Sequence, residues 1–261
     1  MLSTKFTRLS ARLLILGSVV IPVLLFLAAA WLDHQATTAR SREYVVIATN
    51  ALAEQIREAL QTARLILARR LDRVDGMDWP AIGSSREVHE FLARIDHETP
   101  LVQSVFLVDP QGYNSDSSRA FPMQAYDNRE REYYIAARDD DDRLYVSAAF
   151  LGQMTGLPGF TVSQPRLTDG HFDSVVAVTL SPAHFQSFYE KIALSTHYAS
   201  AALLRTDGKL LVRYPDTKPA AQLPEGSPLM RAIKSGDAAG GIFRPVASGR
   251  PPPTVGIPTH C

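Results

Sequence analysis

The sequence lacks the residues and motifs on which several classes of protein depend. Its 261 residues include one cysteine, Cys261, so neither an internal disulfide framework nor a cysteine-built zinc site is available. Lysine plus arginine and aspartate plus glutamate both total 27, and a chain without net charge has no overall basic field for nucleic acid. Motifs of nucleotide binding, serine hydrolases and zinc proteases are missing, and the seven histidines have no metal-ligand spacing. We therefore expect no cofactor, no metal, no nucleic-acid partner and no enzymatic activity.

Charge is also missing from a long stretch near the N-terminus. Residues 13–32 are twenty uncharged residues, and a helix of that length, at about 1.5 Å per residue, crosses a hydrocarbon layer about 30 Å thick. The flanking charges are Lys5, Arg8, Arg12 and Asp33. By the positive-inside rule they predict a single-pass anchor in the cytoplasmic membrane, with residues 1–12 cytoplasmic and everything after residue 32 periplasmic or extracellular. A signal peptide cleaved near residues 28–30 is the alternative, and it exports the same part of the chain.

Glycine and proline are absent between residues 36 and 75. Apolar residues step there by three and four, at Val45, Ala48, Leu52, Ile56, Ala59, Ala63 and Ile66. This spacing predicts one long amphipathic helix, a stalk within residues 33–80 that Gly76 and the Trp79-Pro80 pair bring to an end. Its apolar face suits either docking on the chain's own domain or pairing with a second copy in a homodimer.

Short strand and turn patterns dominate the remainder of the chain. Helices are predicted at 86–97, 130–138 and from Ser181-Pro182 onward. Strands are predicted at 103–108, 113–117, 144–150, 160–166, 175–180, 201–205 and 210–213, separated by turns rich in glycine, proline and aspartate. The pattern predicts an α+β protein with two antiparallel sheets.

Several motifs occur in these segments in a fixed order. They are Phe106-Leu107-Val108-Asp109-Pro110-Gln111-Gly112, Arg131-Glu132-Tyr133-Tyr134, Gly152 with Thr155-Gly156, Asp169-Gly170-His171-Phe172-Asp173, Ser181-Pro182-Ala183-His184-Phe185 and Asp207-Gly208-Lys209-Leu210-Leu211. Together, behind a membrane helix, they resemble the double Cache (PDC-type) extracytoplasmic sensor domains of bacterial diguanylate cyclases, histidine kinases and chemoreceptors. The resemblance implies a membrane-distal PAS-like lobe with the ligand pocket, over residues 81–192, and a smaller proximal lobe, over residues 193–244.

The last seventeen residues, 245–261, depart from that family pattern. Five of them are prolines, which cannot donate to a sheet ladder, so we expect an incomplete proximal sheet and an atypical tail. The family also implies a second membrane helix and a cytoplasmic output domain. We expect that the sequence is the N-terminal fragment of a longer receptor that carries them.

Arg131, Tyr133 and Tyr134 are the sharpest candidates for ligand recognition. A guanidinium offers a bidentate fork to a carboxylate, and tyrosines add a hydroxyl and an apolar wall. The resemblance implies that their helix closes the pocket against strand residues, here Ser147, Ser163 and Arg166, with Asp173 as a further candidate. The alternative is that the tyrosines belong to the core and Arg131 pairs with Asp127. The amino-acid-binding version of the family has tryptophan close after the arginine, where this chain has Tyr133.

The preferred interpretation is a ligand-binding sensor for a small organic anion or an amino acid, anchored in the inner membrane. An anchored exported hydrolase and a structural dimerisation module are the alternatives. The hydrolase would need an activated nucleophile or a metal. The dimerisation module would not require two sheet-bearing lobes.

Overall fold

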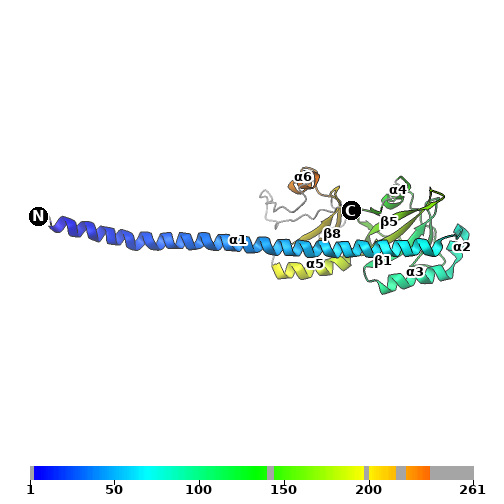
Figure 1. Cartoon of the computed structure of the whole chain (residues 1–261), viewed down its shortest axis with the longest axis horizontal. Helices are drawn as coiled ribbons and strands as arrows, with labels where there is room; N and C mark the ends of the chain where they lie inside the picture. Colours follow the sequence, from blue (N-terminus) through cyan, green and yellow to red (C-terminus); the bar gives the residue numbers. More distant parts are fainter. Residues whose placement is uncertain (1–2, 140–143, 197–199, 216–221, 236–261) are drawn as a thin grey trace. The chain divides into compact units, whose positions relative to one another are not determined.

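The computed structural model describes residues 3–139, 144–196, 200–215 and 222–235 (Figure 1). For three helical segments the structure describes the backbone but not the side chains: residues 3–19, 35–45 and 194–196. The chain divides into two units, Met1–Ala48 and Thr49–Cys261, and helix α1 (Ser3–Val74) begins in the first and ends in the second.

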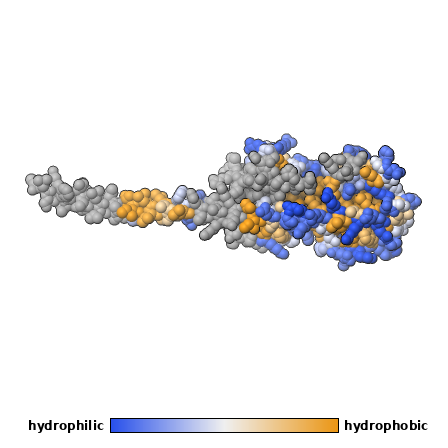
Figure 2. All heavy atoms as spheres, in the orientation of Figure 1, coloured by the Kyte–Doolittle hydropathy of each residue, from blue (hydrophilic) through white to orange (hydrophobic). Residues whose placement is uncertain are grey.

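The first unit consists of the N-terminal part of α1. From Val20 to Leu32 the large apolar side chains are exposed, and Figure 2 shows this segment as an orange surface. Among the residues that the structure describes, no helix is both long and apolar enough to cross a membrane. The predicted cytoplasmic segment 1–12 and the start of the predicted anchor, residues 13–19, lie outside the described side chains.

In the second unit, the apolar face of α1 packs against the chain's own domain. Ile56, Ala59, Ala63 and Ile66 of the predicted face are buried in the main core, which confirms the amphipathic helix and its docking. The helix ends at Val74, whose carbonyl accepts a hydrogen bond from the Met77 amide, and Gly76 takes a left-handed conformation with φ of 70°.

The Trp79-Pro80 pair opens a further helix, which the sequence prediction missed. Helix α2 (Trp79–Ser84) has Asp78 as its N-cap, and the Asp78 carboxylate accepts a hydrogen bond from the Ala81 amide at 2.8 Å. Proline fits at the first helical turn because its missing N–H is not needed there. The prediction that this pair only ends the stalk was therefore incomplete.

An antiparallel sheet of six strands forms the centre of the second unit. Helix α3 (Arg86–Glu98) leads to β1 (Val102–Val108) and β2 (Asn114–Ser117), and helix α4 (Glu132–Asp139) follows. The remaining strands are β3 (Tyr145–Val146), β4 (Phe150–Leu151), β5 (Pro158–Thr168) and β6 (His171–Leu180). Their order is β2-β1-β6-β5-β3, with β4 also paired to β5. The predicted strand 144–150 is thus two short strands.

Both faces of this sheet are covered, and by different helices. Val105 and Leu107 of β1 pack in the core that includes α1 and α3, whereas Phe106 and Val108 pack in a second cluster with α4. The alternation follows from the period of two along a strand. Figure 1 shows α4 on one side of the sheet and α3 on the other.

A second, smaller sheet follows helix α5 (Pro182–Thr196). It pairs β7 (Ala201–Leu204) with β8 (Leu210–Tyr214), and Gly208 supplies the left-handed residue of the turn, with φ of 84°. Helix α6 (Pro228–Ser235), which the sequence did not predict, closes the described part. The α+β class with two antiparallel sheets is confirmed, and the second sheet has two strands within the described residues. The tail 245–261 lies outside them.

Candidate functional site

A small cavity lies on the α4 side of the first sheet, with a volume of about 30 Å³. Strands β1, β2 and β6 form its floor, the start of α4 one wall, and the loop after β4 another. It is lined by Ser104, Phe106, Asn114, Tyr126, Asn128, Arg131, Tyr133, Phe150, Gly152, Gln153, Met154, Thr155 and Thr179. Two of the seven predicted site residues, Arg131 and Tyr133, are among them.

Arg131 reaches this cavity from the turn that starts α4. Its carbonyl accepts the Ile135 amide at 3.1 Å, and its guanidinium lies over the Phe150 ring, 5.2 Å from the ring centre. Within the described residues it has no carboxylate partner. Asp127, the partner that the alternative interpretation offers, instead pairs with Arg129 at 2.7 Å, and the hydrogen bond from Arg129 lowers the pKa of Asp127 to about 2. The fork of Arg131 is therefore available to a ligand.

Tyr133 forms the buried end of a polar chain under the cavity. Its hydroxyl donates to Asn128 Oδ1 at 2.6 Å, and Asn128 Nδ2 donates to Asn114 Oδ1. Burial raises the pKa of Tyr133, so the hydroxyl stays protonated as a donor. The ring packs edge-on against Phe106, at 5.6 Å between centroids. Tyr133 thus serves both the core and the cavity.

The loop after β4 forms the wall of the cavity opposite α4, and two hydrogen bonds hold it in place. Gln103 Nε2 donates to Thr155 Oγ1 at 2.8 Å, and the Gly152 amide donates to the Leu157 carbonyl at 2.9 Å. The cavity is partly open to solvent, and its volume of about 30 Å³ has room for a few water molecules. A ligand as large as an amino acid would extend out of this volume unless the loop and α4 moved apart.

Tyr134, Ser147 and Ser163 lie near the cavity without lining it. The Tyr134 hydroxyl donates to the Pro110 carbonyl at 2.9 Å, which ties α4 to the turn between β1 and β2. Ser147 Oγ accepts the Thr161 amide at 2.9 Å, and Ser163 Oγ donates to the Tyr133 carbonyl at 3.5 Å. These three residues support the walls of the cavity.

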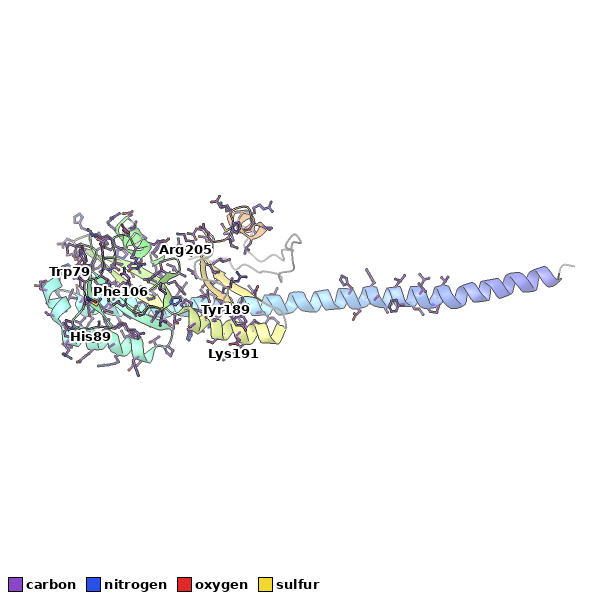
Figure 3. The ribbon with its side chains drawn as sticks, turned by 180° about the vertical axis from the view of Figure 1, so that it is seen from behind. Trp79, His89, Phe106, Tyr189, Lys191 and Arg205 are labelled. Atoms are coloured by element: carbon purple, nitrogen blue, oxygen red, sulfur yellow. The ribbon has the colours of Figure 1, made fainter. Side chains whose placement is uncertain are left out.

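Arg166 and Asp173 lie on the other face of the sheet, against the end of α1. They pair with each other at 3.4 Å, and Arg166 also donates to the Val74 carbonyl at 3.4 Å. Trp79, labelled in Figure 3, donates to Asp173 at 3.4 Å and lies under the Arg166 guanidinium. The structure does not bring these two residues to the cavity. Ser163 and Arg166 are three residues apart on one strand, and a period of two puts them on opposite faces.

Sequence reasoning missed most of the polar lining. Ser104, Asn114, Asn128 and Thr179 are buried, and Thr179 pairs with Thr161 at 3.1 Å between the hydroxyl oxygens. The available signal was β2, whose sequence Asn-Ser-Asp-Ser is entirely polar although most of it is buried. When a polar strand is buried beside a central strand, its side chains need hydrogen-bond partners, and such a strand therefore indicates a polar site.

Glu132, the neighbour of Arg131, connects α4 to the second sheet. Its carboxylate accepts hydrogen bonds from the Ala148 amide and from Arg205 Nη1, both at 2.9 Å, and from Lys209. Burial alone would raise the pKa of Glu132, but these partners outweigh it and lower the pKa to about 2. Arg205, labelled in Figure 3, also donates to the Val146 carbonyl at 3.0 Å. Helix α4, which begins directly after Arg131, is thus held by charge to the β7–β8 hairpin.

Comparison with solved structures identifies the fold. The chain is similar to the extracellular domain of rpHK1S-Z16, a protein assigned as a histidine kinase, with a TM-score of 0.64 and 25% identity over 75% of this chain and 78% of that domain. No protein-family profile and no curated protein matches the sequence.

Two chemoreceptor domains share the fold alone. The ligand-binding domain of the Pseudomonas aeruginosa amino acid chemoreceptor PctC, in complex with GABA, gives a TM-score of 0.50 and 22% identity over 67% of this chain and 76% of that one. The sensory domain of the Campylobacter jejuni chemoreceptor Tlp3, with isoleucine bound, gives 0.51 and 15% over 77% and 80%. These findings confirm the resemblance to extracytoplasmic sensor domains of the Cache type.

Proposed function

We propose that this chain, which has the fold of extracellular sensor domains, is the membrane-anchored input part of a bacterial receptor such as a histidine kinase or diguanylate cyclase. In this proposal residues 13–32 span the inner membrane, residues 33–80 form the stalk, and residues 81–192 and 193–244 form a distal ligand-binding and a proximal periplasmic lobe. The uncharged run of residues 13–32 and the likeness to extracellular domains support this arrangement.

The ligand that the cavity suits best is a small organic anion or an amino acid. The observation that carries this assignment is the Arg131 guanidinium, which lines the cavity and has no carboxylate partner in the described part of the chain. A carboxylate can accept two parallel hydrogen bonds from its fork. The Ser104 hydroxyl and Asn114 Nδ2 also belong to the lining and have no hydrogen-bond partner among the described residues, so they can bind the polar groups at the other end of the ligand.

Ligand entry would act on both sheets through α4. A ligand that separates α4 from the loop after β4 shifts Glu132, which holds Arg205 and Lys209 of the turn between β7 and β8. A signal requires that the ligand bind one arrangement more tightly than the other. Because the structures to which this chain was compared above are extracellular or ligand-binding domains of receptors, binding is favoured over the alternatives of an exported hydrolase or a purely structural module.

The binding proposal is tested with the full chain in lipid nanodiscs. We expect at least one amino acid, GABA or short-chain organic acid to raise the melting temperature, and Arg131→Gln to weaken its binding about tenfold or more, the range for a charged hydrogen bond. Arg129→Gln is the matched control, because Arg129 pairs with the exposed Asp127 and does not line the cavity. Unchanged affinity in Arg131→Gln, or no response to any ligand, would overturn the assignment.

The proposed topology has its own test. Alkaline phosphatase fused after residue 40 is expected to be active in cells, because this enzyme requires the oxidising periplasm for its disulfides. Activity of a cytoplasmic reporter at the same position, with an inactive phosphatase fusion, would overturn the anchor.

A further inference from the structure

A second cavity lies where α1, the first sheet, α5 and the β7–β8 hairpin meet. Its volume is about 350 Å³, an order of magnitude above that of the cavity beside Arg131, and it shares no lining residue with that cavity. Sites for small molecules usually measure about 300–1,000 Å³. This cavity therefore has the size of a ligand site in the conformation that the structure shows.

The walls of this cavity are aliphatic and aromatic. Ile56 and Leu60 come from α1, Phe160 and Leu180 from the first sheet, and Leu203 and Leu211 from the hairpin. Protein interiors are normally packed without voids of this size, because an apolar cavity leaves its lining atoms without contacts. An apolar body fits such walls, whereas water finds few partners there.

The charged groups of the lining are all cationic. Arg64 and Arg205 belong to it, and it contains neither aspartate nor glutamate. Arg205 is already engaged, by Glu132 and Asp207. Arg64 is exposed and forms no ion pair within the described residues, so it is available to a negative group at the rim. The complement of these features is a molecule with an apolar chain and one anionic head.

We propose that this cavity is a second binding site, which takes a free medium-chain aliphatic carboxylate. The alkyl chain lies against Ile56, Leu60, Leu203 and Leu211, and the carboxylate pairs with Arg64. A dry apolar cavity of about 150 Å³ holds benzene, with six carbons, so by proportion 350 Å³ has room for about fourteen carbons, and a chain of about eight to twelve fits within it. The bound chain would sit against Arg205 and hence next to the contact between α4 and the hairpin.

Sodium octanoate is the probe, titrated by calorimetry into the full chain in lipid nanodiscs, with empty nanodiscs as the blank. We expect saturable binding to the protein. Arg64→Gln is expected to weaken octanoate about twofold to fivefold, the range for an exposed ion pair, without affecting 1-octanol. Arg69→Gln, an exposed arginine of the same helix outside the lining, is the matched control and is expected to bind as the parent does.

Variants that fill the cavity with a larger side chain provide a second test. Ala59→Phe places a ring in the space and is expected to abolish octanoate binding, and Leu203→Phe does the same from the hairpin if the first variant fails to fold. Arg131→Gln is expected to leave octanoate binding unchanged, because Arg131 does not line this cavity. The octanoate titration therefore tests the second site independently of the ligand proposed for the cavity beside Arg131. Absence of saturable octanoate binding, or full binding by both filled variants, would overturn the second site. Equal loss of octanol in Arg64→Gln would overturn the carboxylate assignment.

Discussion

Glu132 and Arg205 form an ion pair at 2.9 Å although 73 residues separate them in the sequence. The pair joins the helix that presents Arg131 to the hairpin of the second sheet, and Lys209 adds a second cation to the same carboxylate. Because Glu132 follows Arg131 in the sequence, the pair links the cavity beside Arg131 to the hairpin.

Replacing Glu132 by glutamine removes the charge and keeps the shape. Because Arg205 and Lys209 then lose their ionic partner, we expect a loss of about 1–2 kcal/mol in the free energy of unfolding, the range for hydrogen bonds to charged groups in a partly exposed setting. Chemical denaturation of the full chain measures it. Glu130→Gln is the control, since Glu130 is exposed and makes no ion pair among the described residues. Equal stability of the two variants would contradict the prediction.

The same carboxylate gives the protein a dependence on acid. The pKa of Glu132 falls from the usual 4.5 to about 2 in the folded chain. A depressed carboxyl pKa stabilises the fold fully above about pH 4.5, and this stabilisation is lost as the pH falls toward about 2. The difference in melting temperature between the parent and Glu132→Gln should therefore shrink between pH 6 and pH 3. If the difference in melting temperature stayed constant over this interval, the Glu132 carboxylate would not be the source of the acid dependence.

Arg70 and Asp116 form a buried ion pair between α1 and β2. They lie 2.6 Å apart, with side-chain exposures of 0% and 3%. Burial lowers the pKa of Arg70 to about 10, with Asp116 opposing it, so the guanidinium stays charged at neutral pH. Asp116→Ala leaves this charge buried and unpaired, and we expect a loss of about 3–5 kcal/mol by chemical denaturation.

Two further variants make that prediction specific. The double change Arg70→Met with Asp116→Leu removes both charges and is expected to recover most of the lost stability. Arg73→Met breaks a pair with the exposed Glu87 and should cost no more than about 1 kcal/mol. If the double variant were as unstable as Asp116→Ala, packing rather than the unpaired charge would be responsible.

The two neighbouring tyrosines of α4 have different roles. Tyr133→Phe removes the donor to Asn128 and should cost about 1 kcal/mol of stability and also weaken ligand binding, because Asn128 lines the cavity. Tyr134→Phe loses the hydrogen bond to Pro110 outside the cavity and should cost a similar amount without affecting the ligand. Calorimetric titration with the stabilising ligand separates the two. Equal affinity in both variants would remove Tyr133 from the site.

Local chemistry predicted most of the fold and part of the site. The β-branched runs predicted β1, β5 and β6, and the spacing of Ile56, Ala59 and Ala63 predicted the docked face of α1. Helix α6 was missed although Ser227 and Pro228 repeat the serine-proline start that was recognised at α5, and Ser227 Oγ accepts the Met230 amide.

The site was harder because its partners are distant in sequence. Arg131 was identified by its chemistry. The sequence could not show that Arg131 lacks a carboxylate partner among the described residues, because this depends on Asp127 pairing with Arg129 instead. Asn114 meets Asn128 only after β2 folds against the segment before α4. Arg166 was assigned to the cavity without counting the alternation of side chains along the strand, which places it on the opposite face, where its guanidinium lies over the Trp79 ring.

The same alternation has a consequence for how such a protein can change. On β1, the even-numbered positions 104 and 106 line the cavity beside Arg131. The odd-numbered positions 105 and 107 pack in the core that includes α1 and α3. Strand β1 therefore carries two alternating sets of residues, one facing the cavity and one facing the helices. In the proposed sensor, substitutions in the first set would change ligand preference while the second set preserves the contact with α1.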